Sequence, residues 1–233
     1  MRTFYSVVGG GFGRTAFPFQ GLFENLVRVE SPADIKDNDG VLCLWGGEDI
    51  SPSLYDQRPS DFCGAGATLS ERDIRELECF NRAVDLGLPI LGICRGAQLA
   101  CALLGGKLVQ DVRGHAGVRH RILTDKNEVF TTTSVHHQQL YPWDIPHEMI
   151  AWADGVVGRD HTGEDTEPIQ FPREAFNAAG QLVEPEIVYF PQAKCLAIQG
   201  HPEFMRPDEP FVAYCNHLIQ ERLLSDANQP IAQ

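Results

Sequence analysis

The sequence predicts an α/β fold: a doubly wound, mostly parallel sheet flanked by helices, with some antiparallel strands over the functional site. Short apolar runs alternate along the chain with amphipathic stretches, a pattern typical of consecutive strands and helices. The 233 residues, 43% of them hydrophobic, are enough to bury a sizeable core. Since no repeat, charge run or Ser/Gly linker interrupts them, we expect one domain over residues 1–233.

The strands are expected at the short apolar runs. The candidates for the parallel part of the sheet are Phe4–Val8, Leu26–Val29, Val41–Trp45, Pro89–Ile93 and Lys194–Gln199. The stretch from His115 to Pro191 is richer in turn residues and contains two more candidates, Val129–Thr133 and Glu186–Phe190. We expect this stretch to form partly antiparallel strands and loops laid over the site.

Three helices are expected from their start and stop signals. The first begins after Ser70, because the sequence SERD places a capping serine three residues before an acid, and it ends at Gly87. The second begins at Arg95 and ends at the pair Gly105-Gly106. The third runs from about Glu209 to Leu224.

Charge and cysteine usage exclude several classes of protein. The 32 acidic and 19 basic residues give a net charge of −13, which disfavours binding to nucleic acid or to anionic lipid. The seven cysteines contain no CxxC pair, as expected in a reducing compartment. The N-terminus lacks a signal-peptide core, and no apolar run approaches the ~20 residues of a membrane helix. We therefore expect a soluble cytoplasmic protein.

The clearest chemical motif is a cysteine between a strand and a helix. In the sequence GICRG, Cys94 follows an apolar strand and is flanked by Gly92 and Gly96, as in the nucleophile elbow G-x-S-x-G. The positive end of the helix dipole favours the thiolate there, and the next backbone N–H can bind an oxyanion. An isolated motif of this kind is equally compatible with a core cysteine beside a glycine turn.

Two further segments favour the catalytic interpretation. A strand near the C-terminus ends in His201-Pro202-Glu203, which supplies a base and a carboxylate for a Cys-His-acid triad. Another strand ends in Gly46-Gly47, whose exposed N–H groups can complete an oxyanion hole. Glycine pairs after strands are common turns, so the pair gains meaning only beside the other two motifs.

Together the motifs resemble the class I glutamine amidotransferase superfamily, which has a flavodoxin-like fold, and the resemblance spans about residues 40–203. Three features are similar to its γ-glutamyl hydrolase branch, the peptidase C26 type that includes γ-glutamyl-γ-aminobutyrate hydrolase. They are Arg95 after the cysteine, GGEDISPSLY at Gly46 to Tyr55, and SVHHQ at Ser134 to Gln138. One departure is Gly200, which stands where an aromatic residue is frequent.

The resemblance implies a role for each matching residue. Cys94 is implied as the nucleophile, His201 as the general acid/base and Glu203 as the group that orients it. The amides of Gly47 and Arg95 are implied as oxyanion donors. The residues implied near the glutamyl amino and carboxylate groups are Gln98, Ser134, Val135, His136 and His137.

The resulting hypothesis is a cysteine hydrolase that cleaves a γ-glutamyl amide, or glutamine, through a γ-glutamyl thioester. An alternative is the glutaminase subunit of an amidotransferase, which passes ammonia to a separate synthetase. A non-catalytic binding protein is disfavoured because the motifs of a full triad are present. A synthetase partner and a homo-oligomer both stay open.

Other candidate sites are given simpler interpretations. We expect no metal and no cofactor: the histidines His115, His120, His136 and His137 show no HExxH or cysteine pairing and are interpreted as solvated loop residues. The loop Gly9 to Gly13 lacks a properly spaced GxGxxG and is interpreted as a flexible loop. The Arg95 side chain is either a surface charge or a contact for a substrate carboxylate.

Overall fold

A nine-stranded sheet with the order β2-β1-β3-β4-β13-β12-β10-β7-β8 forms the centre of the fold. The computed structural model describes residues 2–9, 16–155 and 157–225, so most of the expected loop from Gly9 to Gly13 lies outside the described residues. The strands of this sheet are β1 (Thr3–Val7), β2 (Asn25–Val29), β3 (Gly40–Leu44), β4 (Ile90–Ile93), β7 (Val118–Thr124), β8 (Val129–Ser134), β10 (Glu148–Ala153), β12 (Pro185–Phe190) and β13 (Cys195–Ile198).

The five strands from β2 to β13 pair in parallel, and the four strands from β12 to β8 continue the same sheet in antiparallel pairs. The predicted α/β class is confirmed. The expected antiparallel strands are also present, and most of them extend the edge of the central sheet. Two small sheets lie outside it: β5 (Lys107–Val109) with β9 (Gln139–Tyr141), and β6 (Asp111–Arg113) with β11 (Arg159–Thr162).

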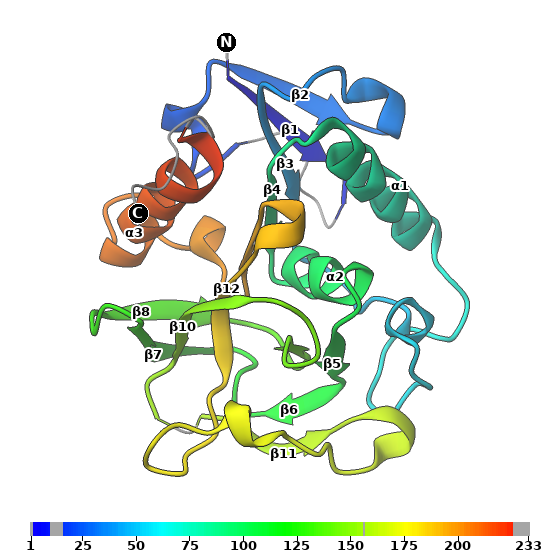
Figure 1. The fold of residues 1–233 in the computed structure, drawn as a ribbon, viewed down its shortest axis with the longest axis vertical. Helices are drawn as coiled ribbons and strands as arrows, with labels where there is room; N and C mark the ends of the chain where they lie inside the picture. The colour runs from blue at the N-terminus through cyan, green and yellow to red at the C-terminus, as the bar shows by residue number, and fades with distance from the viewer. Residues whose placement is uncertain (1, 10–15, 156, 226–233) are drawn as a thin grey trace.

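Helices cover both faces of the parallel strands, with α1 (Glu71–Leu86) and α2 (Arg95–Leu103) on one side and α3 (Pro210–Ile219) on the other (Figure 1). A π-helical turn, Gln220–Leu224, continues α3. Side chains alternate across a strand, so Leu42 and Leu44 pack in the core under α1 and α2, whereas Val41 and Cys43 pack under α3. The parallel strands are therefore buried on both faces, as their near-continuous apolar sequences require.

The ends of α1 follow the predicted signals. The Ser70 side chain accepts a hydrogen bond from the Asp73 amide at 3.0 Å, and the Asp73 carboxylate accepts one from the Ser70 amide at 2.9 Å. Gly87 ends the helix in a left-handed conformation with φ of 67°. The predicted capping box is confirmed.

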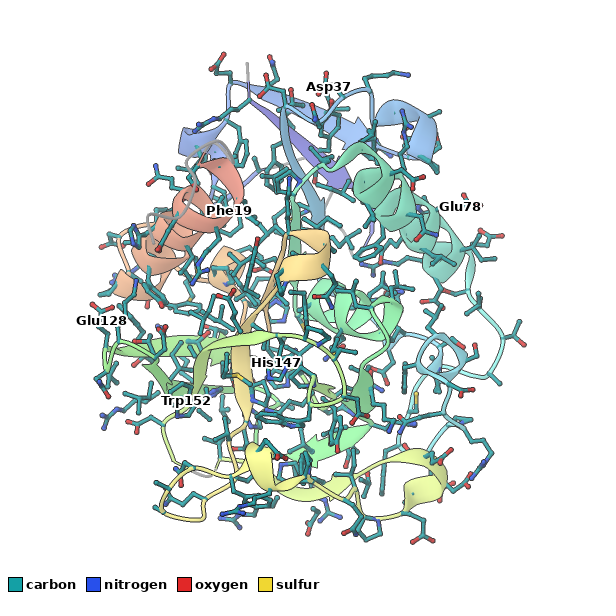
Figure 2. The ribbon with its side chains drawn as sticks, viewed as in Figure 1. Phe19, Asp37, Glu78, Glu128, His147 and Trp152 are labelled. Atoms are coloured by element: carbon teal, nitrogen blue, oxygen red, sulfur yellow. The ribbon has the colours of Figure 1, made fainter. Side chains whose placement is uncertain are left out.

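On the outer side of α1, Glu78 points away from the sheet, whereas Phe19 lies in the core beside α3 (Figure 2).

Within the described ranges, no helix combines the length and the apolar character needed to cross a membrane.

Candidate active site

Cys94 sits in a strained turn between β4 and α2. Its φ and ψ are 49° and −107°, outside the regions that non-glycine residues usually adopt, and its amide is held by the Ile198 carbonyl at 2.7 Å. The flanking glycines are required by close approach: a Cβ on Gly92 would lie 2.6 Å from the Gly96 carbonyl oxygen, and one on Gly96 would lie 2.1 Å from the Leu44 carbonyl oxygen. The expected elbow geometry is therefore present at Cys94.

His201 and Glu203 lie beyond the end of β13, next to Cys94. The His201 amide donates to the Thr133 carbonyl at 3.0 Å, and the His201 Nδ1 lies 2.7 Å from the Glu203 Oε1. Both side chains are buried, and the Phe204 ring stacks on the His201 ring with centroids 4.6 Å apart. This geometry makes Nδ1 the protonated donor to Glu203 and leaves Nε2 to act on another group.

The group that the His201 imidazole interacts with, besides Glu203, is the Cys94 thiol. Burial lowers the pKa of His201, but hydrogen bonding and charge attraction to Cys94 and Glu203 outweigh it, and the net effect raises the pKa. The His201 Nε2 has no well-formed hydrogen-bond partner among the described residues, so its contact with the thiol is loose. Loose contacts of this kind are common in sites without substrate. The arrangement favours a protonated imidazole beside the thiol.

A cavity of about 200 Å³ opens at Cys94. Its lining comprises Gly46, Gly47, Asp49, Cys94, Gln98, Val135, His136, His137, Gln138, His201 and Phe204. The cavity therefore brings together most of the residues that the motifs single out. Ser134 is not part of the lining, because it shares the inward face of β8 with Thr132 and its side chain is fully buried.

The loop Trp45–Gly46–Gly47 is held from behind by Arg72 of α1. The Arg72 Nη2 donates to the carbonyls of Trp45 and Gly46 at 3.0 and 2.9 Å, and its Nε donates to Glu76 at 2.7 Å. Gly47 has a φ of 152°, and a Cβ there would lie 2.1 Å from the Arg72 Nη1. With their carbonyls fixed toward Arg72, these residues present a defined backbone edge to the cavity.

The Arg95 side chain neither faces solvent nor reaches the cavity, so both interpretations of it were wrong. It is fully buried and forms ion pairs with Asp73, at 2.6 Å, and with Glu76. Glu76 also binds Arg72, and Arg72 binds Glu48 at 2.7 Å, so two cations and three anions form one network under the loop of Gly46 and Gly47. The cause is the sharp turn at Cys94, which directs the next side chain back toward α1.

On the opposite wall, His137 lies between two acids. Its Nε2 is 3.1 Å from the Asp49 carboxylate and its Nδ1 is 3.1 Å from the Asp111 carboxylate. The hydrogen bond to Asp49 is the largest influence and, with Asp111, raises the pKa of His137 to about 8 despite partial burial. The same wall of the cavity therefore carries the imidazole of His137 and the carboxylate of Asp49, two groups of opposite charge.

The interpretation of the other histidines as solvated was wrong. His115 and His136 are buried, and the His120 ring is nearly so. The His136 Nδ1 donates to the Gln138 carbonyl at 2.8 Å, and the same carbonyl accepts from the Gln98 Nε2 at 2.9 Å. Gln98 thus fixes the segment that carries His136 and His137. The rings are buried because the sheet brings together β8, β7, β10 and β12, which are consecutive in it, and sequence spacing does not reveal this order.

The family profile of Peptidase C26 matches residues 30–203 of the chain. The chain belongs to the peptidase C26 family. A curated relative, "Putative glutamine amidotransferase Rv2859c" of Mycobacterium tuberculosis, is 38% identical over 116 residues, which cover 47% of this chain and 34% of the relative. A GMP synthase [glutamine-hydrolyzing] of Bacillus cereus is 29% identical over 151 residues, 60% of this chain and 25% of the relative. Each match spans about a third or less of the relative's own length.

Solved structures give the same fold. The structure of PurLQS from Thermotoga maritima superimposes with a TM-score of 0.56 at 15% identity, covering 96% of this chain and 97% of the matched chain. At this identity the likeness concerns the fold alone. The chain is a glutamine amidotransferase-like protein of the peptidase C26 family, with the cavity of Cys94 at the carboxyl ends of β3, β4 and β13.

Some residues at the site of this peptidase C26 protein were not among those expected. Asp49 and Gln138 lie within the quoted motifs GGEDISPSLY and SVHHQ, so the motifs carried a signal for them. Phe204 directly follows the motif HPE. Arg72 lies in the capping sequence SERD, and only the packing of α1 against the loop after β3 reveals its contact with the site. The departure at Gly200, where an aromatic residue is frequent, has a steric cause. A Cβ there would lie 2.1 Å from the Thr132 Oγ1.

Proposed function

We propose that the chain is a cysteine-dependent hydrolase that cleaves the γ-glutamyl amide bond of glutamine or of a γ-glutamyl amine. The observation that carries the proposal is the junction of three elements at one cavity: Cys94 on the strained turn, His201 beside it, and Glu203 at 2.7 Å from His201. A core cysteine has no need of a paired imidazole with a raised pKa.

In the proposed reaction, the Cys94 thiolate attacks the δ-carbonyl carbon of the γ-glutamyl amide. His201, held through Nδ1 by Glu203, protonates the leaving amine from Nε2 as the C–N bond breaks. Water then attacks the thioester with His201 as base, which releases glutamate and restores the thiol. The overall reaction consumes one water molecule and yields glutamate and the free amine. It uses the Cys94 thiol, the His201 imidazole and two backbone N–H groups that bind the oxyanion.

The proposed oxyanion hole consists of the backbone N–H groups of Gly47 and Arg95. The Arg95 amide is the first of α2, where helical N–H groups have no intrahelical acceptor. The Gly47 amide belongs to the loop that Arg72 holds by two carbonyls. Donors fixed before the reaction stabilise the charge that develops on the oxygen without reorganisation.

The cavity suits a small, zwitterionic amino-acid end. Its volume of about 200 Å³ is below the range of about 300–1,000 Å³ that is usual for drug-sized ligands. We assign the α-ammonium group to Asp49 and the α-carboxylate to His137, which lie on the same wall. Gln98 and His136 position this wall, and Val135 lines it. The leaving amine then points out of the cavity, so residues outside the cavity determine which amine is accepted.

The proposal is tested by labelling and by product. A diazoketone analogue of glutamine is expected to modify Cys94 ahead of the other cysteines, because burial raises the pKa of Cys43, Cys63, Cys79, Cys101, Cys195 and Cys215. Cys63 is partly exposed, so Cys63→Ser is the matched control and should keep full labelling. Glutamate release from a panel of γ-glutamyl amides should vanish in Cys94→Ala. Preferential labelling of another cysteine, or release that survives in Cys94→Ala, would refute the proposal.

A second candidate is the glutaminase subunit of an amidotransferase, with the same residues in the same roles. The similarity to a GMP synthase [glutamine-hydrolyzing] supports it, because that name joins glutamine hydrolysis to a synthase. The two candidates differ in whether the chain alone releases glutamate, and in whether amides other than glutamine are cleaved.

A further inference from the structure

Behind the wall that carries His136, six titratable side chains lie in one buried cluster. They are His115, His120, His136, His161, Glu184 and Glu186. The His115 ring lies 4.8 Å from the His136 ring and 4.9 Å from the His120 ring, measured between centroids. The proposed reaction uses only His136 of these residues, and only as part of the wall.

Several polar atoms of this cluster have no hydrogen-bond partner among the described residues. They are both ring nitrogens of His115, the Nδ1 of His120, the Nε2 of His136 and the Oε2 of Glu186. The side chains of His115, His136 and Glu186 are each at least nine-tenths buried. Because a buried polar atom without a partner is costly, this concentration around one point indicates a missing partner.

Three of these side chains bring possible ligand atoms close together. One ligand atom from each of His115, His136 and Glu186 can be chosen so that all three lie within 4.8 Å of one another. The His115 Nδ1 is 3.5 Å from the Glu186 Oε1. Ligands at about 2.0–2.1 Å around a tetrahedral zinc ion are roughly 3.4 Å apart, so the side chains need to close by little more than 1 Å.

The surrounding groups orient the ligands as in known zinc sites, where a ligating histidine donates its other ring N–H to a carboxylate or a backbone carbonyl. The His136 Nδ1 donates to the Gln138 carbonyl, which turns Nε2 toward the cluster. The His115 Nε2 lies 3.5 Å from Glu184, which is itself fixed by the amides of Val157 and Gly158 at 2.8 Å.

We propose that His115, His136 and Glu186 bind one divalent transition-metal ion of the zinc class, with a water molecule completing the coordination. Two imidazole nitrogens and a carboxylate suit Zn²⁺ better than Mg²⁺ or Ca²⁺, which prefer oxygen ligands. The His120 Nε2 stays bound to the Glu186 carboxylate at 2.8 Å and helps to orient it. Neither Cys94 nor His201 is among the donors. This site departs from the expectation that the chain needs no metal.

The ion would tie three segments together. His115 lies between β6 and β7, His136 lies between β8 and β9, and Glu186 lies on β12. The segment of His136 also forms a wall of the cavity. Metal binding would therefore fix that wall to the antiparallel end of the sheet and stabilise the whole chain by binding the folded state only.

The experiment measures metal binding by the 233-residue chain in a Cys94→Ser background, which removes the thiol that lines the cavity. After dialysis against chelator, the protein is titrated with Zn²⁺ against a chromophoric competitor and, separately, with Co²⁺. We expect one ion per chain, a visible tetrahedral d–d band with Co²⁺, and a higher Tm with Zn²⁺. None of these readouts depends on glutamate release, so the result stands apart from the proposed function.

Three variants give the experiment its controls. The double variant His115→Ala/Glu186→Gln should lose the bound ion and the Zn²⁺-dependent rise in Tm. Glu184→Gln leaves all three protein ligands in place and should weaken Zn²⁺ binding about 10- to 100-fold. His217→Ala removes an exposed histidine of α3 and should bind like the parent. Circular dichroism of each variant verifies that it folds.

Failure of the parent to bind one ion, or equal Zn²⁺ binding by a folded double variant, would overturn the proposal. If the double variant does not fold, Glu184→Gln decides: unchanged Zn²⁺ affinity in that variant overturns the proposal, and the expected weakening supports it.

Discussion

At the scale of single residues, Gly47 combines an unusual conformation with no room for a side chain. A Cβ would lie 2.1 Å from the Arg72 Nη1, so Gly47→Ala must displace either the loop or Arg72. We expect glutamate release to fall about 10²- to 10³-fold, the cost of losing one oxyanion donor. Gly87→Ala is the matched control: it also has a positive φ, but has open space around it and lies away from the cavity. It should lower Tm slightly and leave kcat unchanged. Equal kcat in the two variants would contradict the prediction.

The effect of the Glu203 carboxylate on His201 should be visible in the pH dependence of the rate. Together with Cys94 it raises the pKa of His201, so the protonated imidazole persists to higher pH than in an isolated histidine. Removing the charge in Glu203→Gln should lower that pKa and shift the alkaline limb of kcat/KM to lower pH. The rate should fall about 10²- to 10⁴-fold, less than in His201→Ala. A profile that keeps its alkaline limb in place would show that Glu203 does not hold His201.

At the scale of elements, α1 acts on the site through Arg72. Arg72→Lys keeps the charge but cannot hold the carbonyls of Trp45 and Gly46 and the Glu76 carboxylate with one ammonium group. We expect kcat for glutamate release to drop about 10- to 100-fold, with a smaller change in KM, because the loop is less well fixed. Arg82 on the same helix donates to the Ile35 carbonyl, so Arg82→Lys should behave like the parent. A larger change in KM than in kcat would assign Arg72 to substrate binding.

The Arg95 side chain should matter for stability. Arg95→Met leaves Asp73 without its buried cation and Glu76 with one of two, and we expect a loss of about 3–5 kcal/mol in the free energy of unfolding. Arg28→Met breaks an exposed pair with Glu30 and should change that free energy by less than about 1 kcal/mol. Urea denaturation of both variants measures the difference. Equal losses would indicate that the buried network does not stabilise the fold.

At the scale of the whole molecule, the question is whether the chain works alone. Pro52 directly follows the GGEDIS segment and Arg72 binds the carbonyl of its first residue, so we expect the loop to be ordered without a partner. We expect the purified chain to release glutamate from γ-glutamyl amides at about 1 to 10³ per second, the ordinary range of enzymes. A rise of about 100-fold or more on adding a synthetase and its nucleotide would move the function to the glutaminase candidate.

The sequence predicted the parallel strands and all three helices to within a few residues, because apolar runs, the Ser70 cap and the Gly87 stop are local signals. It also predicted which motifs meet at the cavity. It could not predict the fate of Arg95 or of the buried histidines. Those environments depend on residues far apart in the chain, such as Glu76 with Arg95 and Glu186 with His120, which no local pattern relates.

Asp73 has two tasks: one carboxylate oxygen caps the first turn of α1, and the other binds Arg95 beside Cys94. The first turn of the helix therefore cannot fray by itself, as helix ends commonly do. Any opening there releases Arg95 as well, and with it the ionic support of the loop at Gly46 and Gly47. Amide hydrogens at the start of α1 should exchange with solvent as slowly as those in the middle of the helix, and exchange at this turn would report on the integrity of the site from a distance.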